Sequence, residues 1–224
     1  MDFPIKLFIM LVVLAVVSFI TFKAQALNKK GIMLANAVGL AAFLLGGLKA
    51  FSFILALFMF AEAGTRYGRR RKEQKFERRS ISNIIGNTLT ALAMLFLQNY
   101  VAFASAVSCA LADTLSGELG MMTGKKPRLI TTLKEVEVGE EGAVTLFGLL
   151  AAIASSFVIG AMYFVLFSQS IKALMIVWIA GFLGSVADSF LGALLERKKI
   201  IGNTTTNFLA CSIAALISIL LLGL

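Results

Sequence analysis

Residues 206–223, TNFLACSIAALISILLLG, contain no charged side chain over eighteen consecutive positions. An apolar stretch of this length is typical of a helix that crosses a lipid bilayer. The pattern recurs along the chain and predicts an all-α polytopic membrane bundle, a single transmembrane domain over residues 1–224 with about seven to eight membrane-embedded helices. The other apolar runs are at residues 5–22, 31–48, 50–64, 84–98, 100–117, 142–168 and 172–195.

The composition also places the chain in lipid. Of its 224 residues, 59% are hydrophobic and 15% are charged, and the mean hydropathy is +0.91. A soluble domain has about 45–50% apolar and about 25% charged residues, so a soluble core cannot hide this much apolar surface. Runs 50–64 and 84–98 are shorter than the ~20 residues of a straight span, which predicts tilted, broken or re-entrant elements there.

Scarce residue types exclude several classes of site. The chain has no histidine, which excludes an imidazole base, a histidine metal ligand and a Ser-His triad. Its two cysteines, Cys109 and Cys211, both lie in apolar runs. This placement excludes a disulfide scaffold and a zinc-thiolate site.

The positive charges are concentrated between the apolar runs. The net charge is +9, and eighteen of the 21 Lys and Arg residues fall in segments 23–30, 66–79, 125–134 and 197–199. With eight spans, all four segments lie on one membrane face, which the positive-inside rule identifies as cytoplasmic. No basic stretch shows the aromatic interleaving that single-strand binders use, so nucleic acid is not an expected partner. We expect an integral protein of the cell membrane with its active site on the cytoplasmic face.

Two similar motifs carry aspartates at the ends of apolar runs, ADTLSGEL at 112–119 and ADSFLGAL at 187–194. An internal duplication that binds a polar ligand between its halves is a common membrane architecture. We interpret the motifs as an internal repeat, with a chance match in a chain rich in glycine, alanine and leucine as the alternative. The expected repeat halves are residues 83–120 and 181–207.

Acidic side chains in these motifs predict a metal site. A charge at the bilayer centre costs about 2.5 kcal/mol or more, so an acid there is a functional candidate. Asp113, Glu118 and Asp188 supply the oxygen ligands that Mg²⁺ prefers, and we expect them to bind that metal as catalytic residues. Glu62 has an alternative role, because Arg66 follows it at the i,i+4 spacing of a helical ion pair.

Asparagine pairs accompany both motifs. Asn83 and Asn87 open the span before the first motif, and Asn203 and Asn207 open the span after the second. Residues at i,i+4 share a helix face, so each pair can offer two amides to one ligand. We expect all four to bind substrate, together with Ser185 in the glycine-rich stretch before Asp188.

Two polar loops carry candidate phosphate ligands. Loop 118–142 mixes basic residues with threonines, a combination suited to phosphate oxygens. It lacks the G-x-x-x-x-G-K-[ST] spacing, which excludes a P-loop. The arginines of loop 66–79 that lie nearest the membrane either clamp a phosphate or only anchor the topology. The expected substrate-binding or nucleotide-binding residues here are Arg66, Arg70, Lys125, Arg128, Thr131, Thr132 and Glu141, and Lys134 is expected to be catalytic.

Metal ligands, phosphate ligands and apolar helices together predict phosphoryl or nucleotidyl transfer to a lipid. Three functions remain open from the residues. They are a kinase acting on a lipid phosphate, a CTP-dependent cytidylyltransferase making a CDP-lipid, and a cation-coupled transporter whose repeated aspartates carry a cation or proton. The oligomeric state stays open as well, with a homo-oligomer as one alternative.

Four stretches of the chain resemble a known membrane family. They are ALADTLSGELG (110–120), RLITTLKEVEVGEEGAVTLFG (128–148), GFLGSVADSFLGALLE (181–196) and GNTTTN (202–207). In this order they are similar to the family that includes transmembrane protein 19 and plant chloroplast phytyl-phosphate kinase, over about residues 30–220. The resemblance implies a kinase that uses CTP and Mg²⁺ to convert a prenyl monophosphate, phytyl or geranylgeranyl, to the diphosphate.

Overall fold

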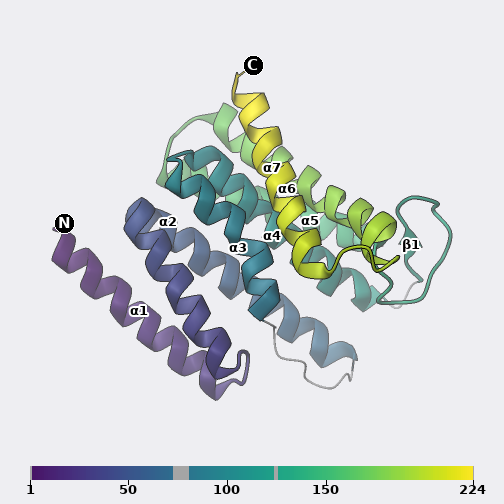
Figure 1. Cartoon of the computed structure of the whole chain (residues 1–224), viewed down its shortest axis with the longest axis horizontal. Coiled ribbons are helices and arrows are strands. Elements are labelled where there is room, and N and C mark those ends of the chain that lie inside the picture. Colours follow the sequence, from purple (N-terminus) through teal and green to yellow (C-terminus); the bar gives the residue numbers. More distant parts are fainter. Residues whose placement is uncertain (1, 73–80, 124–125, 224) are drawn as a thin grey trace.

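The computed structural model describes residues 2–72, 81–123 and 126–223. In these residues it contains seven α-helices, a 3₁₀ turn at Met121–Thr123, a π-helical turn at Gly192–Glu196 and one small hairpin (Figure 1). The all-α class predicted from the apolar runs is therefore confirmed. The helices are α1 (Phe3–Lys23), α2 (Lys29–Lys72), α3 (Ile81–Phe96), α4 (Tyr100–Gly120), α5 (Leu146–Leu166), α6 (Ile171–Leu191) and α7 (Asn203–Gly223), and the strands are β1 (Arg128–Leu129) and β2 (Ala143–Val144).

Six helical segments in the described part of the chain are long and apolar enough to cross a membrane, which confirms a polytopic membrane bundle. Helix α2 contains both predicted runs 31–48 and 50–64 in 44 residues, a length of roughly 66 Å as a straight helix. The helix is interrupted at Gly47, where φ is +68°. Glycine adopts this left-handed conformation without steric penalty. At this point α2 turns back on itself (Figure 1), so it supplies two of the predicted segments.

Helix α4 forms the centre of the bundle. Twelve consecutive residues, 101–112, are buried, and α4 packs against α2, α3, α5, α6 and α7. It is the most buried of the six spans and also the least apolar. Most of its surface therefore faces protein, where small residues such as alanine, serine and glycine allow neighbouring helices to approach closely.

Helices α4 and α6 pack in parallel through glycines of α6. Gly181 lies against Ser108, and a Cβ on Gly184 would lie 2.8 Å from the Cys109 sulfur. The second contact lies closer to the carboxyl end of both helices than the first, so the two helices run in the same direction. Because Asp113 and Asp188 each follow one turn later, this register brings the two repeated motifs side by side.

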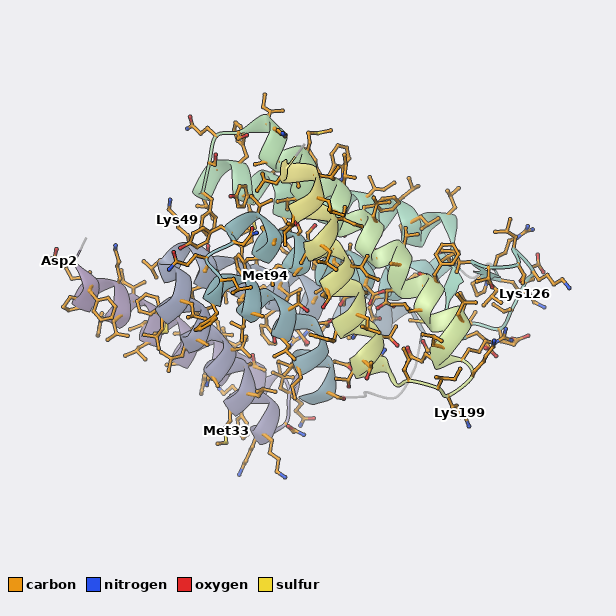
Figure 2. The ribbon with its side chains drawn as sticks, turned by 45° about the horizontal axis from the view of Figure 1, so that its top comes forward. Asp2, Met33, Lys49, Met94, Lys126 and Lys199 are labelled. Atoms are coloured by element: carbon orange, nitrogen blue, oxygen red, sulfur yellow. The ribbon has the colours of Figure 1, made fainter. Side chains whose placement is uncertain are left out.

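The hairpin and the loop between α6 and α7 lie at one end of the bundle. Figure 2 places Lys126 and Lys199 at the end opposite Asp2 and Lys49. Strands β1 and β2 are antiparallel, with Leu129 opposite Ala143. This end also contains the carboxyl-terminal ends of α4 and α6 and the amino-terminal ends of α3 and α7.

Candidate active site

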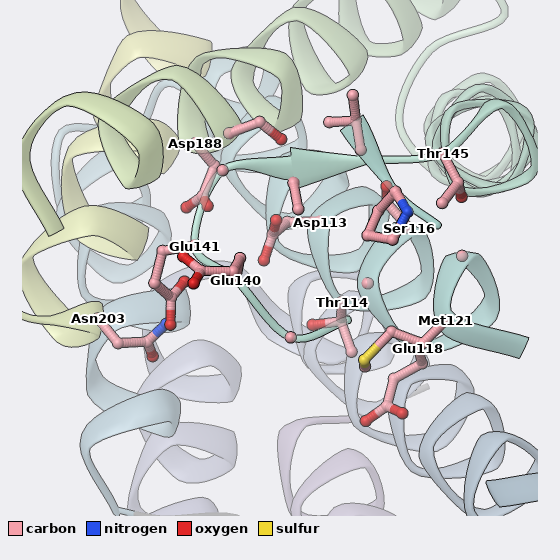
Figure 3. A pocket seen from close by; sticks show the side chains of 18 of the residues that line it. Asp113, Thr114, Ser116, Glu118, Met121, Glu140, Glu141, Thr145, Asp188 and Asn203 are labelled. Atoms are coloured by element: carbon pink, nitrogen blue, oxygen red, sulfur yellow. The ribbon is translucent and has the colours of Figure 1, made fainter. Parts of the chain in front are cut away.

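A polar cavity of about 380 Å³ lies at the hairpin end of the bundle (Figure 3). Its walls come from α2, α3, α4, α6 and α7, and from the hairpin, mainly residues 138–145. The cavity gathers polar side chains from segments far apart in the sequence. Those that line it are Thr65, Asn83, Asn87, Asp113, Thr114, Ser116, Glu118, Glu140, Glu141, Thr145, Asp188, Ser189, Asn203 and Asn207.

The carboxyl groups of Asp113 and Asp188 face each other across this cavity. Figure 3 shows the two side chains next to one another. Within the described residues, Asp188 Oδ2 is a buried oxygen without a hydrogen-bond partner. Neighbouring carboxylates repel each other when both are ionised, unless they share one proton or bind a cation between them. The pair therefore fits a proton or a hard cation such as Mg²⁺.

Glu118 is separated from this pair by the geometry of α4. It lies five residues after Asp113, a rotation of about 140° around a helix. Its carboxylate points away from Asp113 (Figure 3), and its Oε2 would lie 3.0 Å from a Cβ on Gly68 of α2. Among the residues that the structure describes, no three acidic or cysteine side chains gather closely enough to hold a metal ion. The predicted three-carboxylate ligand set is therefore not assembled, although all three line the cavity.

The two asparagine pairs meet where α3 crosses α7. A Cβ on Gly86 would lie 2.8 Å from the Thr204 carbonyl oxygen, so glycine permits the close crossing. Asn207 Nδ2 donates to Asn203 Oδ1 at 3.4 Å. In the described structure, Asn207 Oδ1 is then buried without a partner. All four amides line the same cavity, so the structure brings both pairs to one place.

Two glutamates project into the cavity from the loop before β2. Glu140 and Glu141 lie between Gly139 (φ +95°) and Gly142 (φ +75°), and Figure 3 shows both beside the aspartate pair. A side chain at Gly142 would collide with the backbone of Ala193, so this glycine lets the loop rest on the end of α6. The loop geometry thus depends on glycines at both ends of the Glu-Glu dipeptide.

The two glutamates have different charged neighbours: Glu140 pairs with an arginine, whereas Glu141 lies near other acidic residues. Arg197 Nε donates to Glu140 Oε2 at 3.0 Å. Burial raises the pKa of the Glu141 carboxyl above its usual value, and the negative charges of Glu196 and Glu140 raise it further. Glu196 accepts a hydrogen bond of 2.6 Å from Thr206 Oγ1.

Several residues of the site were not predicted from the sequence. Thr114 and Ser189 line the cavity from the Ser/Thr position of the repeated motif, so the motif itself carried the signal. Thr145 caps α5 by accepting from the Gly148 amide at 3.0 Å, and a threonine before an apolar run is the usual signal for such a cap. Glu196 belongs to the π-helical turn that extends α6, for which the sequence offers no clear signal.

Four predicted phosphate ligands lie outside the cavity lining. Arg128, Thr131, Thr132 and Lys134 are all exposed on the hairpin. Successive side chains of a strand point to opposite sides. Leu129 is buried, so Arg128 points outward, where it pairs with Glu135 at 3.8 Å. The structure does not bring these four side chains to the acidic residues that line the cavity.

Two other predicted residues, Arg66 and Ser185, are also absent from the cavity lining. Arg66 is ion-paired with Glu62 at 2.7 Å, as their i,i+4 spacing indicates. Ser185 is buried within the helix packing of α6. Lys125 and the side chain of Arg70 lie outside the described residues.

The lining is strongly acidic. It includes five carboxyl groups, and none of the described lining residues is lysine or arginine. A cavity lined by one sign of charge concentrates counter-ions, here cations. A phosphate group can enter this cavity favourably only together with cations that offset the carboxylates. Two carboxylates plus substrate phosphates are a usual ligand set for Mg²⁺.

Comparison with known proteins shows relatives across large evolutionary distances. The chain is 32% identical to an uncharacterized membrane protein of Methanocaldococcus jannaschii over 99% of this chain and 96% of that protein. In Arabidopsis thaliana, it is 38% identical to Protein PGR over 42% of this chain and 39% of that protein. It is 27% identical to the chloroplastic protein VTE6 of the same plant, over 81% of this chain and 63% of that protein.

No solved structure matches the chain. The family model described as integral membrane protein DUF92 matches residues 12–215, which include every residue given above as lining the cavity. The chain therefore belongs to the integral membrane protein family DUF92.

Proposed function

We propose that the chain is a membrane-embedded kinase that transfers the γ-phosphoryl group of CTP to a prenyl monophosphate. The observation that carries the proposal is the pair Asp113 and Asp188 in an acidic cavity within a helical membrane bundle. Further support comes from the motifs that resemble those of chloroplast phytyl-phosphate kinase, and from the similarity to a chloroplastic plant protein.

The residues present fit a divalent cation. Asp113 and Asp188 would hold Mg²⁺, because the unpartnered Asp188 Oδ2 and Asn207 Oδ1 are oxygen donors lining the same cavity. When bound, the metal would neutralise the negative charge of the phosphates. The asparagine amides can donate to phosphate oxygens, and the Glu140–Glu141 loop forms one wall of the cavity.

The proposed transfer needs no protein nucleophile. An oxygen of the prenyl monophosphate attacks the γ-phosphorus of CTP, the bond to the β-phosphate oxygen breaks, and CDP leaves with the electron pair. Positioning and electrostatic stabilisation supply most of the catalysis in phosphoryl transfer. The absence of histidine from the sequence is consistent with this chemistry. We place the site on the cytoplasmic face of the cell membrane, because the positive-inside rule assigns the basic segments to that face and two of their residues, Lys126 and Lys199, lie at the hairpin end.

The position of the radiolabel in CTP decides between the two transfer reactions. Purified protein would be incubated with Mg²⁺, geranylgeranyl monophosphate and CTP labelled at either the α- or the γ-phosphate. A kinase transfers only the γ label to the lipid and releases CDP. A cytidylyltransferase transfers only the α label and releases pyrophosphate. No label in the lipid from either CTP would contradict both, and ATP in a parallel reaction tests the choice of nucleotide.

The acidic lining favours one further candidate, cation-coupled transport. Five carboxyl groups and no lysine or arginine among the described lining residues are also what a cation pathway requires. Protein reconstituted in vesicles would then carry Mg²⁺ or protons across the bilayer without CTP. Ion flux without lipid product would favour the transporter over the kinase.

A further inference from the structure

A second cavity adjoins the polar one. It is a groove of about 80 Å³ between α1, both halves of α2, and α3. Asn83 and Asn87 line both cavities, so the groove and the acidic cavity meet at these two amides. The turn at Gly47 creates the groove, because it brings the two halves of α2 side by side. The apolar walls include Leu14, Val17, Phe51, Ile54, Phe58 and Ile84.

Three polar side chains that line this groove, those of Ser18, Asn36 and Thr88, are hydrogen-bonded within the protein. Ser18 Oγ lies 3.0 Å from Asn36 Oδ1, and Asn36 Nδ2 donates back to Ser18 Oγ at 2.9 Å. Thr88 Oγ1 donates to the Ile84 carbonyl oxygen of its own helix at 2.7 Å. Satisfied groups of this kind present little polarity to a ligand. The groove away from the two asparagines is therefore a surface for hydrocarbon.

We propose that this groove binds the single hydrocarbon chain of the lipid monophosphate whose phosphate enters the acidic cavity. Asn83 and Asn87 then mark the junction between chain and phosphate. The inference rests on the proposed function for the identity of the head group. The groove is much smaller than the polar cavity, which favours one chain over the paired chains of a diacyl lipid.

Two alanines of α2 offer a matched test. Ala35 lines the groove, whereas Ala37 is exposed two residues further along the same helix. Ala35→Phe fills the groove, and Ala37→Phe adds the same ring to the outer surface. We expect Ala35→Phe to raise the KM for geranylgeranyl monophosphate by about tenfold or more, with the KM for CTP unchanged. Ala37→Phe should leave both constants at wild-type values.

Equal constants in the two variants would overturn the groove assignment, and so would a matching rise in the KM for CTP. A direct measurement covers the case in which Ala35→Phe fails to fold. Wild-type protein is photolabelled with a geranylgeranyl monophosphate that carries a diazirine at the far end of its chain. Label on Val17, Phe51 or Leu55 supports the groove, and label confined to exposed faces contradicts it.

Two further results separate the inference from the proposed function. If wild-type protein converts no prenyl monophosphate but the probe still labels the groove, the proposed kinase activity fails and the chain site stands. If turnover occurs without groove labelling, the kinase stands and the chain site fails. Competition of the labelling by geranylgeranyl monophosphate but not by dioleoyl phosphatidic acid supports a single-chain site. Equal competition by the diacyl lipid contradicts it.

Discussion

Gly184 of α6 lies against Cys109 of α4, and one turn further along both helices Asp188 meets Asp113. The two residues of each pair are 75 positions apart, the offset that separates the two ADT and ADS motifs. Parallel helices packed at this register place equivalent residues opposite each other. The repeated motif therefore produces a pair of facing carboxyl groups rather than two separate acidic sites.

Replacing either aspartate by asparagine tests the role of the pair. Asp113→Asn and Asp188→Asn keep the side-chain size and remove one negative charge, so turnover should fall by about two orders of magnitude or more. Membrane insertion and the elution profile in detergent should stay normal. Glu135→Gln, on the exposed hairpin, is the control. Near-normal turnover of either aspartate variant would contradict the proposed site.

Metal binding should be detectable without turnover. If Asp113 and Asp188 share a divalent cation, Mg²⁺ should stabilise wild-type protein and raise its melting temperature. At a hundredfold excess of Mg²⁺ over Kd, the free energy of unfolding should increase by about 2.7 kcal/mol. Without metal, Asp188→Asn should be as stable as wild type or more stable, because it removes carboxylate repulsion. The same variant should lose most of the Mg²⁺ shift. An unchanged shift would place the metal elsewhere.

The glycine contact beneath the aspartates should be sensitive to size. A Cβ on Gly184 would lie 2.7 Å from the Ala214 Cβ and 2.8 Å from the Cys109 sulfur. Gly184→Ala should therefore destabilise the protein by about 1–3 kcal/mol and push the two aspartates apart. Gly223→Ala, where nothing lies within 4 Å, is the matched control. Thermal unfolding of both variants measures the difference, and equal melting temperatures would contradict the tight packing.

Glu141 should make stability depend on pH. Its pKa is raised in the folded protein, first by burial and then by Glu196 and Glu140, so the folded state favours the protonated form. The stabilisation is fully present below the usual glutamate pKa and is lost as pH rises through the raised value. In metal-free buffer, acidification should raise the melting temperature of wild-type protein more than that of Glu141→Gln. Parallel curves for the two proteins would contradict the raised pKa.

Helix positions were predictable from the sequence because apolar length and i,i+4 spacing are local properties. The break in α2 occurs at Gly47, two residues before the predicted gap at residue 49, and the asparagine pairs share a helix face as their spacing requires. The same helical geometry explains why the predicted ligand set of three is not assembled. Glu118 lies about 140° around α4 from Asp113, so it cannot share the face that meets Asp188.

The loop residues were less predictable because tertiary contacts determine their orientation. Leu129 is buried and Arg128 points outward, a choice fixed by the pairing of β1 with β2. Glu140 and Glu141 reach the cavity because Gly142 rests on Ala193 at the end of α6. A sequence motif rich in basic residues and threonine predicts phosphate chemistry but does not determine which side of a hairpin faces the site.

Lys134 provides the last test, because the sequence predicts that it contacts phosphate and the structure places it on the exposed part of the hairpin. Exposed charges contribute about 0.2–1 kcal/mol, so Lys134→Ala should change the KM for CTP by about fivefold or less. Glu140→Gln provides the comparison, because its carboxylate lines the cavity and pairs with Arg197 at 3.0 Å. That change should lower the Mg²⁺ affinity more than Lys134→Ala does. A KM increase well above fivefold for Lys134→Ala would show that the hairpin reorients when nucleotide binds and that Lys134 then reaches the phosphates.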